Sequence, residues 1–333
     1  MSEMWTPRCL RPDYTWPCPM REPIRTTTPP TPRIPGHFQR KLTGYVHNAL
    51  IKLSGWYCAW FQLPYECNNA HLPFGLVMKQ TERTSVEEVA AMMMARAAGM
   101  PVPKVLSCGE HYSSTNRPPI FSKSGEHIGY ACKPIVSILM TRLPGIDLFD
   151  SADDLDVEVE GPWLTELKQC IAAMRKWTSP YGEGICSALG TQIHSTRVPF
   201  NSMGPFSDQR ELYQYLFSPV SAEGFGSEDS EVEFDKVLAE ATKLRELSHR
   251  VTFTHGDLKA HNILVTDDGH LSGILDWETG GWYPEYWEFT TAMRSSKDSW
   301  WSQTAAWMGG DQYSKELACD RALHRLTGGT YAW

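Results

Sequence analysis

A short polar segment, THGDLKAHNILV (residues 254–265), has the residue types of a reaction centre. Asp257 lies in a short loop, Asn262 follows after four intervening residues, and the chain then turns apolar, as at the start of a strand. A carboxylate in such a loop can accept a hydrogen bond from a substrate hydroxyl and orient that hydroxyl for attack. Asp257 is therefore the candidate catalytic residue.

A second carboxylate, Asp276, is predicted to meet Asn262 in space. The sequence NILVTDDGHLSGILDWE predicts two short strands joined by an Asp-Asp-Gly turn, and a tight hairpin brings its two ends together. Amide and carboxylate oxygens are hard ligands that suit Mg²⁺ with bound phosphates. Asn262 and Asp276 are therefore the candidate metal ligands, and Mg²⁺ is the expected metal.

The order of these residues matches the phosphoryl-transfer arrangement of the protein-kinase class, in which an aspartate handles the nucleophile while an asparagine and a second aspartate hold the metals. Such a site also needs a lysine that binds the nucleotide phosphates, and in this class the lysine comes from a second lobe of the protein. Lys79, in the strand-like sequence GLVMKQ, is the candidate, because a helix that carries glutamates follows it. Glu88 is favoured as its ionic partner, and Glu87 stays open, since both also suit the first turn of that helix.

A small strand-rich lobe is predicted for residues 39–143. It has three strand-like runs and, between the first two, apolar residues at helical spacing. Ser85 with Glu88 is a candidate capping box for that helix, and Gly99 followed by Pro101 ends it. The strand-like runs cover residues 72–80, 104–110 and 134–143, and the helix covers residues 84–100.

A larger, helix-rich lobe is predicted for residues 144–333, so the expected fold class is α+β with two lobes. Two segments fit this plan least. Residues 1–38 are rich in proline and cannot bury enough apolar surface to offset their ordering entropy, so we expect a flexible tail or a segment draped on the surface. Residues 111–133 are polar and rich in turn formers, and we expect a long loop or insertion there.

The composition excludes several classes of protein. The chain has 333 residues, of which 41% are hydrophobic, enough for one large domain or two modest ones. A net charge of −8 argues against a nucleic-acid partner, and no apolar run is long enough to cross a bilayer. The N-terminus lacks a signal-peptide pattern, and nine cysteines without a Cys-x-x-Cys pair fit reduced thiols. We expect a cytoplasmic protein without a nucleic-acid, membrane or obligate protein partner.

The motif HGDLKAHNILV, together with ILDWE, resembles the aminoglycoside phosphotransferase and choline kinase family. More narrowly, LPFGLVMK, GMPVPKVLSCGEH, SILMTRLPG, ILDWETGGWYPEYWEF and RLTGGTY resemble the fungal phosphotransferase-domain proteins of that superfamily. The matching segments occur in order over roughly residues 60–333, so the resemblance covers a whole domain. It implies a two-lobed protein-kinase-like fold with ATP and Mg²⁺ as cofactors.

The same resemblance implies a role for each candidate residue. Asp257 is the catalytic base, and His255 braces the catalytic loop. Asn262 and Asp276 bind the metal, while Lys79 binds the nucleotide phosphates. The sequence LMTRLPG is the hinge between the lobes, whose backbone groups contact adenine. It supplies Met140, Thr141, Arg142 and Leu143.

Several positions depart from the protein-kinase pattern. Gly256 stands where protein kinases usually have an arginine that pairs with a phosphorylated activation loop. Trp277 and Glu278 follow Asp276 in place of Phe-Gly, and no Ala-Pro-Glu motif comes after them. These differences favour a small-molecule kinase over a protein kinase. The nucleotide loop differs as well, since no Gly-x-Gly-x-x-Gly precedes Lys79 and KLSGWYCAWFQLPYECNN stands there instead.

The candidate substrate residues are Glu278, directly after the metal aspartate, and Trp282, although Trp282 and Tyr283 equally suit core packing. The expected function is ATP- and Mg²⁺-dependent transfer of the γ-phosphoryl group to a hydroxyl of a small molecule. The alternative is a catalytically weak or inactive pseudokinase-type binding module on the same fold, favoured by the missing glycine loop. The sequence does not identify the acceptor, because function depends on the site and this superfamily phosphorylates many alcohols.

Overall fold

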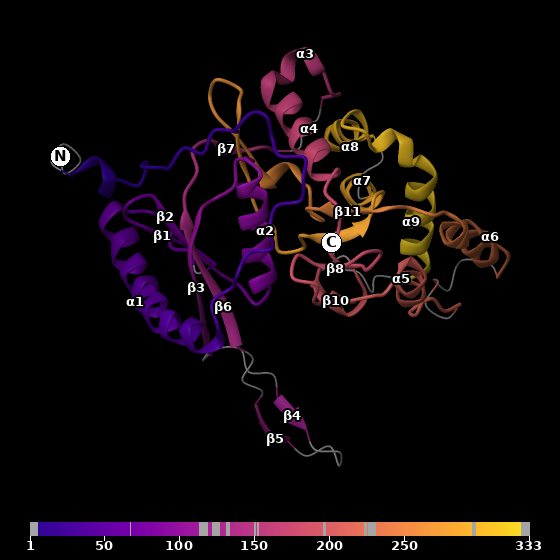
Figure 1. Cartoon of the computed structure of the whole chain (residues 1–333), viewed down its shortest axis with the longest axis horizontal. Coiled ribbons are helices and arrows are strands. Elements are labelled where there is room, and N and C mark those ends of the chain that lie inside the picture. The colour runs from indigo at the N-terminus through magenta and orange to yellow at the C-terminus, as the bar shows by residue number, and fades with distance from the viewer. Residues whose placement is uncertain are drawn as a thin grey trace.

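The computed structural model describes residues 6–66, 68–112, 119–121, 127–130, 134–149, 151, 153–195, 198–222, 225, 231–294 and 298–327. A sheet-containing N-terminal lobe lies beside a larger C-terminal lobe that is mainly helical (Figure 1). This arrangement confirms the predicted α+β, two-lobed fold class. Within the described residues, no helix combines the length and the apolar content that a membrane span needs.

The N-terminal lobe is built on four antiparallel strands in the order β1-β2-β6-β3. The predicted strand-like run 72–80 is interrupted by a turn, and Leu72 pairs with Leu76 across it. Lys79 lies on an inner strand, between Asn69 of one neighbour and Ile138 of the other. The strands are β1 (Asn69–Leu72), β2 (Leu76–Gln80), β3 (Val105–Tyr112) and β6 (Pro134–Thr141).

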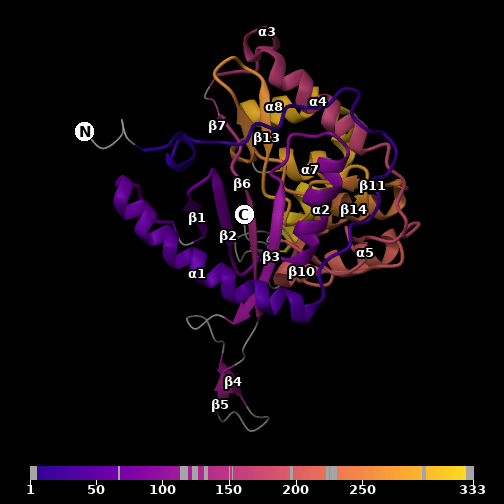
Figure 2. The same cartoon turned by 60° about the vertical axis from the view of Figure 1, so that its left-hand side comes forward.

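A long helix, α1 (His37–Phe61), precedes the sheet, where the sequence analysis predicted no helix. It runs obliquely across the sheet, on the opposite side from α2 (Figure 2). Helix α1 and strand β3 approach so closely that a Cβ on Gly44 would lie 2.2 Å from the carbonyl oxygen of Glu110. Because α1 ends at Phe61, most of the segment KLSGWYCAWFQLPYECNN (residues 52–69) is helical. No strand precedes β1 in the described part of the chain.

Helix α2 (Val86–Ala97) begins and ends as predicted. The Glu88 amide donates to the Ser85 hydroxyl at 3.2 Å, which satisfies one of the free N–H groups of the first turn. The Glu88 carboxylate bonds Lys79 instead of closing the capping box. At the other end Gly99 has φ +97°, a left-handed conformation that terminates the helix.

Residues 6–36, here called the N-terminal strap, run across both lobes (Figure 1). Hydrogen bonds tie the strap to the β1–β2 turn, the hinge, the end of α2 and the segment after α4. Two alternatives were predicted for the proline-rich residues, a flexible tail and a segment draped on the surface, and the strap corresponds to the second. The proline-rich region ends where α1 begins. The bonds are Phe74 N to Cys9 O (2.8 Å), Trp16 N to Arg142 O (2.8 Å), Arg25 N to Ala98 O (2.9 Å), Trp177 Nε1 to Arg25 O (2.9 Å) and Thr178 N to Thr28 Oγ1 (2.8 Å).

The predicted insertion at 111–133 contains a hairpin. Strand β3 continues to Tyr112, and β4 (Pro119–Phe121) pairs with β5 (His127–Tyr130) in a ribbon that extends away from the sheet (Figure 1). The rest of this segment lies outside the described residues.

Two small sheets in the C-terminal lobe hold the polar segment from which the sequence analysis started. The predicted hairpin is β12 paired with β13, and its turn is closed by a 2.9 Å bond from the Gly269 amide to the Thr266 carbonyl. The sheet orders are β13-β12-β7 and β11-β14-β8, and β14 was not predicted. The strands of these two sheets are β7 (Ile146–Asp147), β8 (Cys186–Ser187), β11 (Val251–Thr254), β12 (Ile263–Val265), β13 (Leu271–Ile274) and β14 (Gly281–Pro284). A separate antiparallel pair is formed by β9 (Ile193–His194) and β10 (Ser202–Met203).

Helices surround these sheets and bury their faces. The helices are α3 (Val157–Glu160), α4 (Pro162–Met174), α5 (Gln209–Leu216), α6 (Glu231–Thr242), α7 (Trp287–Met293), α8 (Trp300–Trp307) and α9 (Ser314–Leu326). Short 3₁₀ turns lie at Arg8–Leu10, Pro199–Asn201, Lys243–Glu246, Ala260–Asn262 and Gly310–Tyr313.

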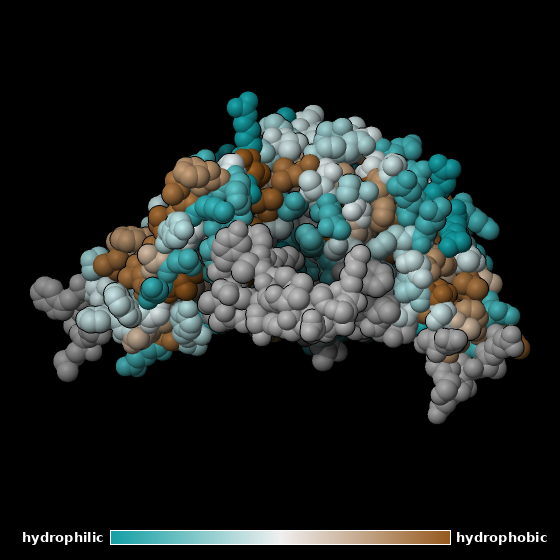
Figure 3. Space-filling model, turned by 90° about the horizontal axis from the view of Figure 1, so that it is seen from below, coloured by the Kyte–Doolittle hydropathy of each residue, from teal (hydrophilic) through white to brown (hydrophobic). Residues whose placement is uncertain are grey.

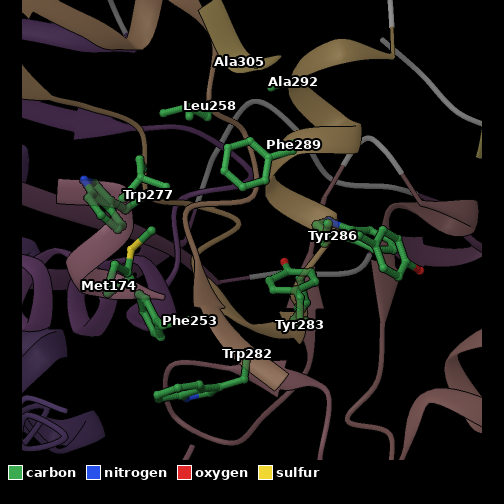
Figure 4. Packing of buried hydrophobic residues seen from close by; sticks show 14 of the residues in the cluster. Met174, Phe253, Leu258, Trp277, Trp282, Tyr283, Tyr286, Phe289, Ala292 and Ala305 are labelled. Atoms are coloured by element: carbon green, nitrogen blue, oxygen red, sulfur yellow. The ribbon is translucent and has the colours of Figure 1, made fainter. Parts of the chain in front are cut away.

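One hydrophobic cluster fills the C-terminal lobe and continues under α2. Trp282 and Phe253 lie in this core with their ring centroids 5.0 Å apart and their planes nearly perpendicular (Figure 4). Tyr283 is equally buried and packs on Trp287. Of the two alternatives for Trp282 and Tyr283, the structure favours packing.

Candidate active site

Lys79 lies at the centre of a cluster of carboxylates drawn from both lobes. Its Nζ is 2.7 Å from Glu88 Oε1 and 2.6 Å from Asp276 Oδ1. The other candidate partner, Glu87, accepts instead from the hydroxyl of Thr191 at 2.7 Å. The structure therefore pairs Lys79 with Glu88, and it joins the sheet, α2 and the Asp276 loop through one ammonium group.

Burial shapes the electrostatics of this cluster. Desolvation acts to lower the pKa of Lys79, but the charges of Glu88 and Asp276 outweigh it, so this pKa lies above its usual value. Burial raises the pKa of Glu88, against the influence of Lys79. For Glu278, burial first and the Asp276 carboxylate second raise the pKa to about 7. The ammonium of Lys79 therefore stays charged at neutral pH, while the Glu278 carboxyl keeps its proton to a higher pH than an exposed glutamate does.

One hydrogen bond within the catalytic loop, and two between this loop and the loop of Asp276, hold these segments together. The Asn262 side-chain amide donates to the Asp257 carbonyl at 2.9 Å, and the Leu275 amide donates to the Asn262 carbonyl at 2.8 Å. The fully buried His255 ring bonds the Leu275 carbonyl through Nε2 at 2.8 Å. The His255 ring thus links the two loops, and the bracing role predicted for it stays a prediction. Asp276 itself has φ +59°, an unfavourable conformation for a residue with a Cβ.

A buried carboxylate, Glu288 of α7, holds the start of the catalytic loop. It accepts the His255 amide at 2.6 Å and the Gly256 amide at 3.1 Å. The chain turns sharply there, because Gly256 has φ +81° and a Cβ at this position would lie 2.7 Å from the Thr279 hydroxyl. The backbone conformation therefore requires glycine at this position, where protein kinases usually have arginine.

Asp257, the candidate catalytic base, is mostly buried, and its Oδ1 lies 3.4 Å from Nζ of Lys259. Lys259 is about one-third exposed and was not identified in the sequence analysis. A carboxylate and an ammonium side by side can accept a proton and stabilise nearby negative charge, which phosphoryl transfer requires.

A cavity of about 420 Å³ lies between the lobes and collects the predicted nucleotide residues. Its polar end has Lys79, Glu88, Asn262 and Asp276, and its apolar walls come from both lobes. Asp257 and His255 lie outside this lining, although they share a loop with Asn262. The complete lining is Asn69, His71, Val77, Lys79, Glu88, Met92, Pro103, Met140, Thr141, Arg142, Leu143, His261, Asn262, Leu264, Leu275 and Asp276.

All four predicted hinge residues line this cavity, but two of their amides already have partners. The Thr141 amide donates to the Lys104 carbonyl at 3.1 Å, and the Arg142 amide donates to the Gly75 carbonyl at 2.7 Å. Within the described part of the chain, the Leu143 amide has no backbone hydrogen bond. Of the hinge amides at 141–143, that of Leu143 is thus the one left for a ligand.

The two predicted substrate residues do not reach this cavity. Glu278 is 7% exposed, and its carboxylate lies 3.3 Å from Nε of Arg83 and 3.9 Å from Nζ of Lys79. Trp282 is fully buried in β14. Glu278 therefore joins the lobes through cations of the N-terminal lobe, and Trp282 is a packing residue.

Three residues that shape the site were missed: Glu288, Lys259 and Thr279, whose hydroxyl donates to the His255 carbonyl at 2.7 Å. Lys259 lies within the quoted motif, and its position two residues after Asp257 could have identified it. Glu288 gave no local signal, because it approaches the loop from a helix more than thirty residues downstream.

The fold and site agree with a comparison against known families. The model of the phosphotransferase enzyme family matches residues 76–323, which is most of the chain and includes Lys79, Asp257 and Asp276. The chain therefore belongs to the phosphotransferase enzyme family. The narrower fungal resemblance stays a prediction. No curated protein matches the sequence.

Solved structures to which this chain is similar include aminoglycoside phosphotransferases. A thermostable mutant of APH(4)-Ia, in a ternary complex with AMP-PNP and hygromycin B, has 16% identity and a TM-score of 0.49, and the match covers 75% of this chain and 76% of that one. An aminoglycoside-3'-phosphotransferase of type VIII has 15% identity and a TM-score of 0.43, with 75% and 84% covered. APH(3'')-Id from Streptomyces rimosus has 15% identity and a TM-score of 0.39, with 77% and 88% covered.

Proposed function

We propose that the protein is an ATP- and Mg²⁺-dependent phosphotransferase that transfers the γ-phosphoryl group to a hydroxyl of a small molecule. The observation that carries this proposal is the meeting of Lys79, Asn262 and Asp276 at the polar end of one interlobe cavity that the hinge also lines. The cavity is within the usual range for a small-molecule or cofactor site.

The two ends of the cavity suit the two parts of a nucleotide. Val77 of the N-terminal lobe, with Leu264 and Leu275 of the C-terminal lobe, gives the apolar walls that a planar base needs. In this proposal the Leu143 amide donates to the base, because the amides of Thr141 and Arg142 are engaged. The Lys79 ammonium binds the phosphates.

The residues at the polar end fit Mg²⁺. The Asn262 amide nitrogen is used by the Asp257 carbonyl, so its oxygen remains for a ligand, and Asp276 supplies a carboxylate on the same cavity wall. The described residues contain no group of three or more His, Cys, Asp or Glu side chains that would hold a metal by themselves. This suits Mg²⁺, which binds few protein carboxylates together with substrate phosphates. When bound, the ion neutralises charge that develops on the transferring phosphoryl group.

Asp257 accepts the hydrogen bond of the acceptor hydroxyl and takes up its proton as the new O–P bond forms. The bond between the γ-phosphorus and the bridging oxygen of the β-phosphate breaks in the same transfer, and ADP leaves. Lys259, 3.4 Å away, stabilises the developing negative charge. The small-molecule class of acceptor is supported by Gly256, whose turn leaves no room for an arginine that would read an activation loop. Glu278 and Trp282 have no role in this proposal, because the one faces Lys79 and Arg83 and the other lies in the core.

A second candidate, nucleotide binding without turnover, is favoured by one observation. In the described part of the chain, α1 and not a strand precedes β1, so a strand–loop–strand clamp over the phosphates is absent there. Asp276 also holds Lys79 at 2.6 Å. If this second candidate is correct, Mg-ATP stabilises the protein but no acceptor leads to ATP consumption.

The test combines binding and turnover. Thermal unfolding is followed with and without millimolar Mg-ATP, and ATP consumption is screened over small alcohols and amino-alcohols with Asp257→Ala as the control. We expect a rise in Tm for both proteins and turnover only for the parent. Turnover that persists in Asp257→Ala contradicts the assigned role, and no Tm rise in either protein contradicts nucleotide binding.

A further inference from the structure

Helix α1 places its large apolar side chains on the outside. Its buried positions are mostly small or polar residues: Gly44, His47, Ser54, Tyr57 and Cys58. Its outer face carries large side chains with high exposed fractions. They are Phe38 (75%), Leu42 (52%), Tyr45 (75%), Val46 (58%), Leu53 (39%), Trp56 (76%) and Trp60 (75%). A surface helix ordinarily turns its apolar stripe towards the core, so this pattern is reversed.

The inner face of α1 is specific, which excludes a simple rotation of the helix. His47 is buried and bonds Ser137 through Nδ1 at 2.7 Å and Ser107 through Nε2 at 2.8 Å. Gly44 touches the backbone of Glu110, where any side chain would collide. Turning the aromatic residues inwards would break both contacts. The outer face therefore needs a cover from outside the chain's own sheet.

Seven of the outer positions form one line along the helix, here called the outer stripe: Phe38, Leu42, Tyr45, Ala49, Leu53, Trp56 and Trp60. Successive members are separated by 4, 3, 4, 4, 3 and 4 residues, so the spacing is the same in both directions from Ala49. At 1.5 Å per residue the outer stripe is about 33 Å long. In Figure 3 hydrophobic residues gather on the side of the molecule where α1 lies in Figure 1.

We propose that the outer stripe is a self-association surface on which α1 of a second copy of this chain packs antiparallel, with the two-fold axis at Ala49. A symmetric dimer requires a surface that is complementary to itself, and the symmetric spacing gives this. Phe38 then faces Trp60 of the second copy, Leu42 faces Trp56, and Tyr45 faces Leu53. The small Ala49 side chains meet at the centre, where two helices approach most closely.

The available area is what a stable dimer needs. An aromatic side chain offers roughly 150–250 Å² of contact area, and four of them are about three-quarters exposed on this face. With the aliphatic residues, the outer face offers roughly 800 Å² per copy, which is the usual size for a specific protein–protein interface.

The charges of α1 are compatible with this register. The helix has no Asp or Glu, and its Lys and Arg residues are Arg40, Lys41 and Lys52. With the axis at Ala49, Lys52 faces Val46 of the second copy, and the position related to Lys41 is Tyr57, which is buried on the inner face, so no like charges oppose each other. The charged residues of α1 are all cationic and its tryptophans are exposed, a composition that is also found in helices that lie on anionic membranes. Vesicle binding is therefore one outcome of the test.

The first experiment measures the mass of the full-length protein in solution over a range of concentrations. We expect a dimer for the parent, and for Trp56→Glu a self-association at least about 30-fold weaker, as expected for a central aromatic contact. The matched control is Phe149→Glu, since Phe149 is an aromatic residue outside α1 whose exposed fraction, 75%, is close to the 76% of Trp56. It should leave the dimer unchanged. A parent that is monomeric at about 50 μM overturns the proposal, as does a dimer that survives Trp56→Glu.

The second experiment tests the register. Under mild oxidation Ala49→Cys should form a disulfide-linked dimer, because the two-fold axis brings this position next to its own copy. Ala59→Cys is the control on the same exposed face, roughly 30 Å from its copy in this register. This variant and the parent protein show how much disulfide-linked dimer forms through the native thiols alone. Equal linking by both variants overturns the register. Monomers that sediment with phosphatidylserine vesicles and lose this with Trp56→Glu assign the face to a membrane instead.

Discussion

Replacing Glu278 by glutamine should change how stability depends on pH. The Glu278 carboxyl is buried and lies close to Asp276, and its pKa is raised from 4.5 to about 7 in the folded chain. A carboxyl with a raised folded pKa favours folding most below its unfolded pKa and loses that contribution as pH rises through the folded pKa. The parent should therefore lose stability relative to Glu278→Gln as pH rises.

The expected size follows from the shift. A shift of roughly 2.5 pKa units corresponds to about 3 kcal/mol, of which about 2 kcal/mol falls between about pH 5.5 and about pH 8.5. Urea unfolding of both proteins at a series of pH values measures the difference in the free energy of unfolding. We expect Glu278→Gln to gain about 2 kcal/mol over the parent across this range.

The reasoning has an internal control and a clear refutation. Asp276 is the second cause of the shift after burial, so the gain should shrink when the same pair is compared in an Asp276→Asn background. If the difference in unfolding free energy between parent and Glu278→Gln stays constant within about 0.5 kcal/mol over this range, the carboxyl titrates like an exposed one and the argument fails.

Three further predictions concern the catalytic loop and its neighbours. Asp257→Ala should lower turnover by about 10²–10⁴-fold in an ATP-consumption assay while nucleotide binding persists. Asp276→Ala should weaken Mg-ATP binding by calorimetry, and affinity equal to that of the parent would disprove its assignment as a metal ligand. Gly256→Ala should cost about 1–3 kcal/mol in unfolding free energy, because a Cβ would lie 2.7 Å from the Thr279 hydroxyl at φ +81°. Gly55→Ala, in open space on α1, is the control and should be neutral or stabilising.

The sequence predicted those parts of the site whose signals are local. The pairing of Lys79 with Glu88 depends on a strand and a helix that are adjacent in the chain, and the hairpin that carries Asn262 and Asp276 is closed by its own turn. Each follows from periodicity and turn chemistry within about twenty residues. The order of the lobes followed from the strand-like and helical patterns along the chain, and the family resemblance added the protein-kinase-like fold.

The rest depends on contacts between distant segments. Glu288 holds the catalytic loop from α7, and Glu278 faces Arg83 of the other lobe, so neither orientation is encoded in nearby residues. Helix α1 was missed because its burial pattern is reversed. Its inner face fits the sheet through Gly44 and His47, which a search for apolar faces does not identify as core.

The N-terminal strap has a consequence for the order in which this chain folds. Domains fold largely as the chain is synthesised, from the N-terminus onwards. The strap is synthesised before the residues that hold it, which include Phe74, Ala98, Arg142, Trp177 and Thr178. Docking of its part around Arg25 and Thr28 is therefore complete only when Trp177 and Thr178 have been made, well after the strands and helices that immediately follow the strap. Until then this part of the nascent chain lacks these partners and is exposed to chaperones and proteases.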